Sequence, residues 1–252
     1  NIMNIMSVDK RIRANFGFGH YNALGAACVL IIMLTLYLRK IQKARKVDYI
    51  FAVISVIMLL CSASRNAITG IIIFLIAYII KRMKYSGINP RVVVAIKCLF
   101  ILLIISTIPF MYELNYSEIL KISQRSLIFY VAFPLYMKSG RILIGLGYAS
   151  NADYGSNLTP YMTSWLDNSY MYYLITTGVI GFAIIMIALV VIWRGLEKNK
   201  NFESTEIICC MYYVYMYMGL FEVTIFESGS LLNYVYLPLF IFAATKKQKI
   251  LE

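Results

Sequence analysis

The chain is a succession of long apolar runs separated by short polar gaps. The runs are roughly fifteen to twenty-five residues long, and a helix needs ~20 apolar residues to cross a bilayer. This pattern predicts about seven membrane-spanning helices, at residues 22–38, 48–63, 66–80, 93–110, 168–193, 206–226 and 231–245. We therefore expect an all-α integral membrane protein, a polytopic helical bundle in which residues 1–252 form one membrane domain.

One gap is much longer than the others. Residues 111–167 separate the fourth and fifth predicted spans and include an apolar segment at 126–137. This segment is too short to cross a bilayer and is typical of an interfacial or re-entrant helix. Long loops in compact proteins often carry function, so we expect part of the site here. The chain begins with Asn1 in a polar stretch, which predicts further spans upstream.

Basic residues gather in alternate gaps, at 39–46, 81–91, 194–200 and 246–249. Short loops rich in lysine and arginine remain on the cytoplasmic side of a membrane. The N-terminal stretch, the turn at Arg65, the loop 111–167 and the turn near Glu227 are then expected to face outward. This distribution accounts for the net charge of +12 and argues against a nucleic-acid partner.

Composition agrees with a membrane protein and narrows the chemistry. The chain is 61 % hydrophobic and 14 % charged, with a mean hydropathy of +0.73. Its five cysteines all lie in apolar runs without paired spacing, which argues against a disulfide framework and against a metal site.

Arg65 is the single charged residue between Tyr49 and Ile80. The two predicted spans beside it hold about fifteen apolar residues each, or ~22 Å of helix, less than the ~30 Å hydrocarbon layer. We therefore expect the turn at Arg65 to lie at membrane depth, in a cavity that opens outward. The alternative is that Arg65 snorkels to headgroup phosphates, but charges inside a membrane are usually functional.

An outward cavity lined by cations suits a lipid-linked phosphate or pyrophosphate, because guanidinium groups bind phosphate bidentately. The cations expected on this face besides Arg65 are Arg11, Arg13, Lys121, Arg125, Lys138 and Arg141. Each could also be an ordinary surface charge, except that Arg125 directly precedes the apolar segment, where a chance position is harder to explain.

Several uncharged and acidic residues are further candidates for the same site. Asp167, followed by Asn168, could be a helix N-cap or the general base that deprotonates a sugar hydroxyl. His20 and Asn22 could cap a helix or contact a polar ligand. Glu222, predicted to lie within a span, could pair with an arginine or serve catalysis.

Four stretches occur in a recognisable order: "GFGHYNALG", "SASRNAITG", "SQRSLIFYVAFPLYMKSGRILIGLGY" and "WLDNSYMYYLITTGVIG". Over residues 13–182 this order resembles the bacterial O-antigen polymerase and ligase superfamily. The resemblance implies transfer of an oligosaccharide from an undecaprenyl-pyrophosphate donor, at the outer face of the cytoplasmic (inner) membrane. It implies that Arg65, Arg125 and Arg141 grip the pyrophosphate, that Asn168 and Tyr170 contact the substrate, and that no metal, nucleotide sugar or other cofactor is used.

The ligases of this superfamily have a histidine at the position of Asp167. This departure favours a Wzy-type polymerase, which joins the repeat units of O-antigen, capsule or exopolysaccharide and works beside flippase and chain-length regulator proteins. Two alternatives remain: a ligase-type transferase that uses another acceptor, and a flippase or transporter for an anionic lipid-linked substrate. Transporters often contain internal repeats, and we find no convincing repeat in this chain.

Overall fold

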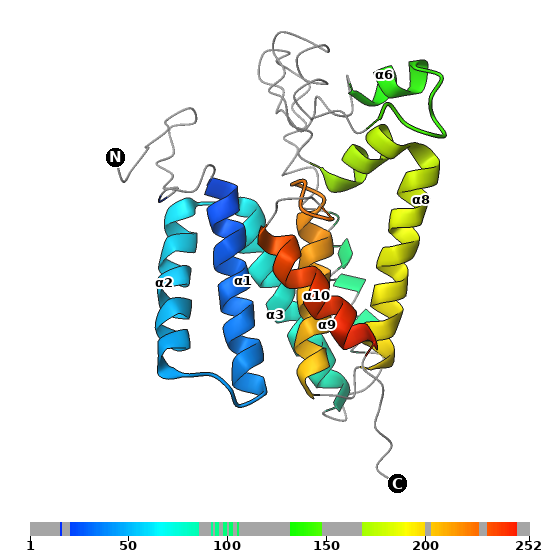
Figure 1. Ribbon diagram of the computed structural model, residues 1–252. Coiled ribbons are helices and arrows are strands. Elements are labelled where there is room, and N and C mark those ends of the chain that lie inside the picture. The colour runs from blue at the N-terminus through cyan, green and yellow to red at the C-terminus, as the bar shows by residue number, and fades with distance from the viewer. Residues whose placement is uncertain are drawn as a thin grey trace. The chain divides into compact units, whose positions relative to one another are not determined.

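The computed structural model describes residues 21–85, 132–147, 168–199, 203–226 and 231–245, together with Phe16 and scattered positions between 92 and 105. The helices of these residues are α1 (Tyr21–Lys40), α2 (Lys46–Ser62), α3 (Arg65–Tyr85), α6 (Phe133–Lys138), α8 (Ser169–Lys198), α9 (Glu203–Met218) and α10 (Leu231–Thr245) (Figure 1). No strand occurs in the described ranges, which confirms the all-α prediction for that part of the chain.

The chain divides into two compact units. Unit 1 comprises Asn1–Pro90, Ile192–Met218 and Ser228–Glu252, and unit 2 comprises Arg91–Val191 and Gly219–Glu227. Helices α1, α2, α3, α9 and α10 belong to unit 1, and α6 belongs to unit 2. Most of α8 lies in unit 2, and its last turns lie in unit 1.

The exposed side chains indicate a membrane protein. Helices α1, α3 and α8 are long and apolar enough to cross a bilayer. Helix α2 turns large apolar residues outward, including Phe51, Val53 and Leu60, whereas it buries Ser55 and Ser62. Water would disfavour so much exposed apolar surface, and lipid tails would not.

Small residues bring the helices of unit 1 close together. Helix α3 packs against both α1 and α9. A Cβ atom at Gly25 of α1 would lie 2.8 Å from the Cβ atoms of Ser64 and Ala67, and one at Gly70 would lie 3.3 Å from Val214 of α9. Small residues on two faces of α3 therefore let it approach both neighbours.

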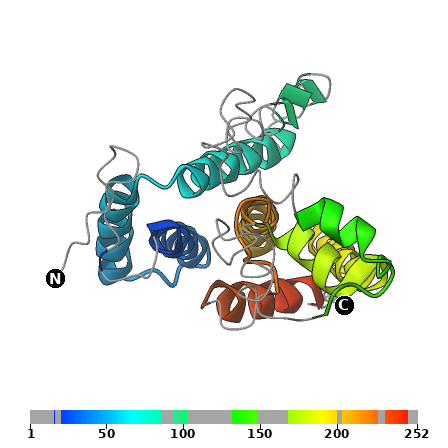
Figure 2. The ribbon, with the colours of Figure 1, turned by 90° about the horizontal axis from the view of Figure 1, so that it is seen from above.

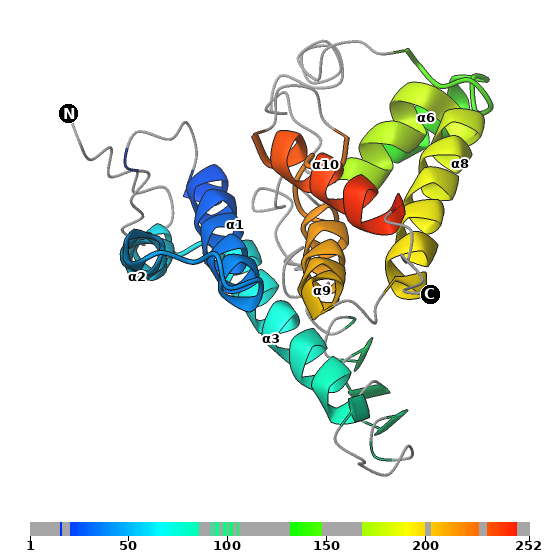
Figure 3. The same cartoon turned by 60° about the horizontal axis from the view of Figure 1, so that its bottom comes forward.

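Helix α10 has the bounds predicted from the sequence and lies across the side of α9. Figure 2 looks along α1 and α9, whereas α10 runs lengthwise through the view, and Figure 3 shows the same crossing. Aromatic contacts hold the crossing: the ring of Phe240 lies 5.2 Å from that of Tyr212 and 5.5 Å from that of Tyr215. The Tyr215 hydroxyl also donates a hydrogen bond to Asn233 Oδ1.

Three predicted spans need correction. The segment predicted at 66–80 begins at Arg65 and continues to Tyr85, so α3 has 21 residues and is not a short helix. The premise of a short α3 is therefore wrong, whereas the depth of Arg65 in the membrane stays a prediction. The segment 206–226 is helical only as far as Met218, and α8 is interrupted at Gly178. Only scattered positions of the span predicted at 93–110 are described, all of them helical, and most of the loop 111–167 lies outside the described residues.

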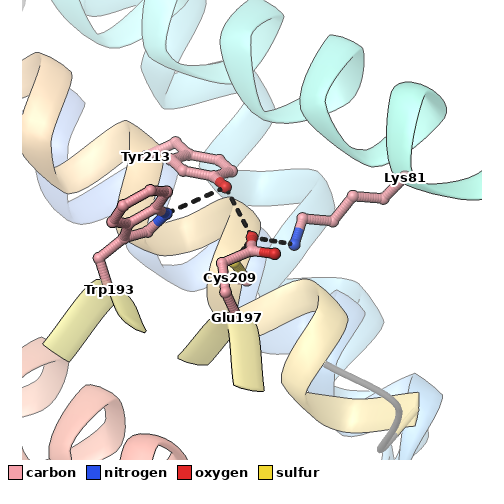
Figure 4. Close-up of polar contacts among 5 residues, drawn as sticks. All are labelled: Lys81, Trp193, Glu197, Cys209 and Tyr213. Atoms are coloured by element: carbon pink, nitrogen blue, oxygen red, sulfur yellow. Dashed lines mark hydrogen bonds and ion pairs between the residues drawn. The ribbon is translucent and has the colours of Figure 1, made fainter. Parts of the chain in front are cut away.

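Glu197, near the end of α8, links α8 to α3 and α9 within unit 1 (Figure 4). Its Oε1 atom accepts hydrogen bonds from Lys81 Nζ at 3.0 Å, from the Tyr213 hydroxyl at 2.8 Å and from Cys209 Sγ at 3.1 Å. The indole of Trp193 reaches the Tyr213 hydroxyl at 3.5 Å. One carboxylate oxygen thus links the end of α3, the end of α8 and the middle of α9.

A second contact joins the same end of α8 to α10. Asn199 Nδ2 donates to the carbonyl oxygens of Ala243, at 3.1 Å, and Ala244, at 2.9 Å. The starts of three basic gaps, after α3, α8 and α10, therefore meet at one end of unit 1. The basic gaps are expected on one side of the membrane, and the meeting of these three helix ends agrees with that expectation.

We expect Glu197→Gln to destabilise unit 1. The substitution leaves the Lys81 ammonium, whose side chain is 16 % exposed, without its counter-charge, and losing one partner of such a contact lowers stability by roughly 1–3 kcal/mol. The midpoint of thermal unfolding in detergent should fall by roughly 2–4 °C for each kcal/mol. Arg45→Gln is the control, because Arg45 pairs with Asp48 at 3.9 Å while 80 % exposed; equal midpoints for the two variants would contradict the role of Glu197.

Candidate functional site

One candidate site, in unit 1, is the turn between α2 and α3. Ala63 ends α2 in the left-handed conformation, with φ +47°, and Arg65 is the first residue of α3. The Ser64 hydroxyl donates to Asn22 Oδ1 at 3.0 Å. Two of the quoted sequence stretches, 42 residues apart, are therefore joined by a buried polar contact directly beside Arg65.

The electrostatics of this turn favour an anion. Arg65 is partly buried and lies at the positive end of the α3 helix dipole, where the Ser64 hydroxyl accepts a hydrogen bond from the Ala67 N–H at 3.4 Å. The first turn of α3 contains no acidic residue. A guanidinium at a helix N-terminus is unfavourable for the fold, and a bound anion relieves the repulsion.

Asn66, the next residue, was not singled out from the sequence. It is 2 % exposed, and neither Oδ1 nor Nδ2 has a hydrogen-bond partner. A buried polar group without a partner costs about 1–3 kcal/mol. The signal that could have identified it is an amide placed within an apolar run immediately after the one charge.

A separate candidate site, in unit 2, is the start of α8. Asn168 Oδ1 accepts a hydrogen bond from the backbone N–H of Met171 at 2.9 Å, so Asn168 is the N-cap of α8. Asn168 Nδ2 donates to the Leu220 carbonyl at 2.9 Å. The capping role considered for Asp167 therefore belongs to its neighbour; Asp167 itself lies outside the described residues.

Ser169 joins α8 to the irregular segment 219–226. Its hydroxyl is fully buried, donates to the Glu222 carbonyl at 2.8 Å and accepts from the N–H groups of Thr224, at 2.8 Å, and Ile225, at 3.1 Å. Glu222 therefore does not lie in a membrane-spanning helix as predicted. It lies in a turn, partly buried, with its backbone fixed by Ser169.

The break in α8 is closed by residues 142–147. Gly178 has φ +69° and ψ −175°, a conformation open only to glycine. The carbonyls of Ile175 and Thr176 accept from the N–H groups of Leu146 and Gly147, while Val179 and Ile180 donate to the carbonyls of Ile142 and Leu143. These four bonds satisfy the four backbone groups that would otherwise pair in two helical bonds, from Val179 to Ile175 and from Ile180 to Thr176.

Two glycines allow the backbones to meet at this break. A Cβ atom at Gly145 would lie 2.4 Å from Gly178 N and from the Thr176 carbonyl oxygen, and one at Gly178 would lie 2.3 Å from the Leu143 carbonyl oxygen. Gly145 of the third quoted stretch and Gly178 of the fourth therefore serve backbone contact. Arg141, exposed at the start of this segment, is presented by it.

The short helix α6 supports the same segment. The Tyr136 hydroxyl donates to the Ile142 carbonyl, and its ring packs in a cluster with Tyr172, Tyr173 and Ile175 of α8. Burial raises the pKa of Tyr136, so its hydroxyl remains a donor. Helix α6 covers the last residues of the apolar segment 126–137, whereas residues 126–131 lie outside the described part, and the interfacial or re-entrant placement of the segment stays a prediction.

The structure groups the predicted residues into two sets. Unit 1 brings Arg65 and Asn22 together, while unit 2 contains Arg141, Asn168, Tyr170 and Glu222. His20, Arg125 and Asp167 lie outside the described residues. Among those described, no group of three or more histidine, cysteine or acidic side chains is arranged to hold a metal ion. The chain matches no protein-family model and no curated protein.

Gly178→Ala is expected to open the contact between α8 and residues 142–147. The substitution adds a clash with the Leu143 carbonyl to an unfavourable backbone conformation. Hydrogen exchange of the Leu146, Gly147, Val179 and Ile180 amides should accelerate strongly. Gly140→Ala is the control, because Gly140 has φ +70° with nothing within 4 Å of the added Cβ. This variant should be less stable only by the roughly 1–2 kcal/mol that the left-handed conformation costs an alanine. Equal exchange in both variants would contradict the assignment.

Ser169→Ala is expected to loosen the segment 219–226. Removing the hydroxyl leaves two N–H groups and one carbonyl without their partner, which should lower stability by roughly 1–3 kcal/mol. Faster hydrogen exchange at Thr224 and Ile225 is the specific readout. Ser139 makes similar contacts with Tyr136 and Arg141 but is exposed, so Ser139→Ala should change exchange little. Unaltered protection in the Ser169 variant would contradict this role.

Proposed function

We propose that the protein is a membrane glycosyltransferase that polymerises undecaprenyl-pyrophosphate-linked oligosaccharide repeat units on the outer face of a bacterial inner membrane. The observation that carries the proposal is the environment of Arg65. A guanidinium begins an apolar helix that has no acid in its first turn, beside a turn fixed by the Asn22–Ser64 contact. This arrangement favours an anion, and a lipid-linked diphosphate is an anion that a membrane enzyme can reach laterally.

The proposed reaction is substitution at the anomeric carbon of the donor. A hydroxyl of the acceptor attacks that carbon, the bond to the diphosphate oxygen breaks, and the diphosphate leaves with the bonding electrons. Arg65, with Arg125 and Arg141, stabilises the charge on the leaving group. Asp167 accepts the hydroxyl proton, and Asn168, Tyr170, Glu222, His20 and Asn22 contact the sugars or position these groups.

A transporter is the main alternative of a different class, and the break in α8 bears on it. Interrupted helices of transporters use their free backbone groups to bind ions and substrates. In α8, the carbonyls of Ile175 and Thr176 and the N–H groups of Val179 and Ile180 are bonded to residues 142–147. Those groups are therefore not available to a transported ion, which favours a transferase.

A ligase on the same scaffold is separated from a polymerase only by residue 167. The resemblance places histidine there in ligases, and this chain has Asp167. Aspartate and histidine are both able to accept a proton from a hydroxyl. The choice of polymerase therefore depends on that one residue and is tested by the length of the product.

Arg65→Ala is expected to abolish polymer while single repeat units still reach the cell surface. Loss of a preorganised group that stabilises transition-state charge lowers a rate by about 10²–10³-fold, and Arg65→Lys should recover activity only partly because lysine lacks the planar fork. Gel analysis of surface polysaccharide is the measurement. Arg82→Ala, at the opposite end of α3, is the matched control and should retain full-length chains.

Unchanged chain length in the Arg65 variants would contradict the proposal. In reconstituted vesicles, movement of lipid-linked substrate without formation of a new glycosidic bond would favour the transporter. Transfer of one unit to another acceptor, with no polymer, would favour the ligase.

A further inference from the structure

The side-chain amide of Asn66 is an exception within unit 1. Buried polar groups in proteins nearly always have a hydrogen-bond partner, and other buried groups around this turn follow the rule. Ser64 donates to Asn22, and Ser62 donates to the Leu59 carbonyl. Asn66 alone in this turn has both its donor and its acceptor atoms buried without a partner.

The position of Asn66 is defined by its neighbours on α3. Gly70, one turn further along, contacts Val214 and Met218 of α9, while Ala67 contacts α1 at Gly25. Asn66 shares the stripe of Gly70, so its amide lies on the side of α3 that packs against α9. It is thus adjacent in sequence to Arg65 and directed into the helix bundle at the same helix end.

We propose that Asn66 binds the glycosyl diphosphate that Arg65 holds. Nδ2 donates to a phosphoryl oxygen, and Oδ1 accepts from the hydroxyl or amide on the sugar carbon next to the anomeric centre. This inference rests on the proposed function and adds a residue and a specificity to it. A bare phosphate would use only the donor of an amide, whereas a sugar diphosphate offers both partners within one residue's reach.

The proposal separates binding from stability. Because Asn66 has no partner in the protein, Asn66→Leu should keep or raise the unfolding midpoint while lowering the affinity for the ligand. Asn199 supplies the opposite control, since its amide bonds to Ala243 and Ala244 within the protein. Asn199→Leu should lower the midpoint and leave ligand affinity unchanged.

The test uses the full chain in lipid nanodiscs and two probes, undecaprenyl diphosphate and undecaprenyl diphosphate carrying N-acetylglucosamine. Binding is measured by native mass spectrometry, with unfolding midpoints recorded on the same samples. Asn66→Leu should lower the affinity for the bare diphosphate about tenfold and the affinity for the glycosylated probe by a further three- to tenfold. These factors are roughly those expected for a charged and a neutral hydrogen bond. Asn66→Asp, which keeps the shape and removes the donor, should also weaken both probes and covers the case in which the leucine variant does not fold.

The outcomes distinguish the two proposals. If Arg65→Ala weakens both probes while the Asn66 variants bind within twofold of wild type, Asn66 holds only an internal water; the inference fails and the proposed function stands. If Asn66→Leu weakens the two probes equally, the predicted sugar contact is wrong. If the wild-type protein binds neither probe, the proposed function fails and the inference fails with it.

Discussion

The need to pair every backbone N–H and carbonyl away from water governs this fold. A helix satisfies those groups internally, so a helical membrane protein can expose apolar side chains at no such penalty. Each departure from helix must then find partners elsewhere in the chain. The two largest departures described, the break at Gly178 and the segment 219–226, are both closed by residues distant in sequence or by a single buried hydroxyl.

This constraint explains why the glycines and serines of the chain matter as much as its charged residues. Gly145 and Gly178 allow two backbones to approach so closely that four hydrogen bonds replace those lost from α8. Ser169 serves three backbone groups with one oxygen. The result is a partly buried Glu222 and an exposed Arg141 held on well-ordered backbone, where flexible loops would leave both undefined.

The sequence predicted the helices better than their interruptions. Helix α10 matches the expected 231–245 because one apolar run is bounded by polar residues at both ends. The end of α9 was missed because the residues after Met218 are as apolar as those before it, and hydropathy does not register that Ser169 captures their backbone. Likewise, Gly178 lies in an unbroken apolar run, and its backbone conformation depends on residues 142–147. The sequence singled out Arg65 as the one charge in an apolar stretch and Asn22 as a possible ligand contact, but their proximity depends on the Ser64 contact across 42 residues.

The turn from Ala63 to Asn66 combines several features that each lower the stability of the fold. Ala63 is a non-glycine residue with positive φ, Arg65 puts a cation at the positive end of a helix, and Asn66 buries an amide without a partner. Each feature is destabilising by itself, and three within four residues would be hard to retain for the fold alone. At the other end of α3, the partly buried Lys81 is bonded to Glu197, so the chain supplies a partner for that polar side chain, whereas the more deeply buried amide of Asn66 has none. Local rules tend to be broken where function requires it, and a polar ligand would supply the hydrogen-bond partners that Asn66 lacks within the protein.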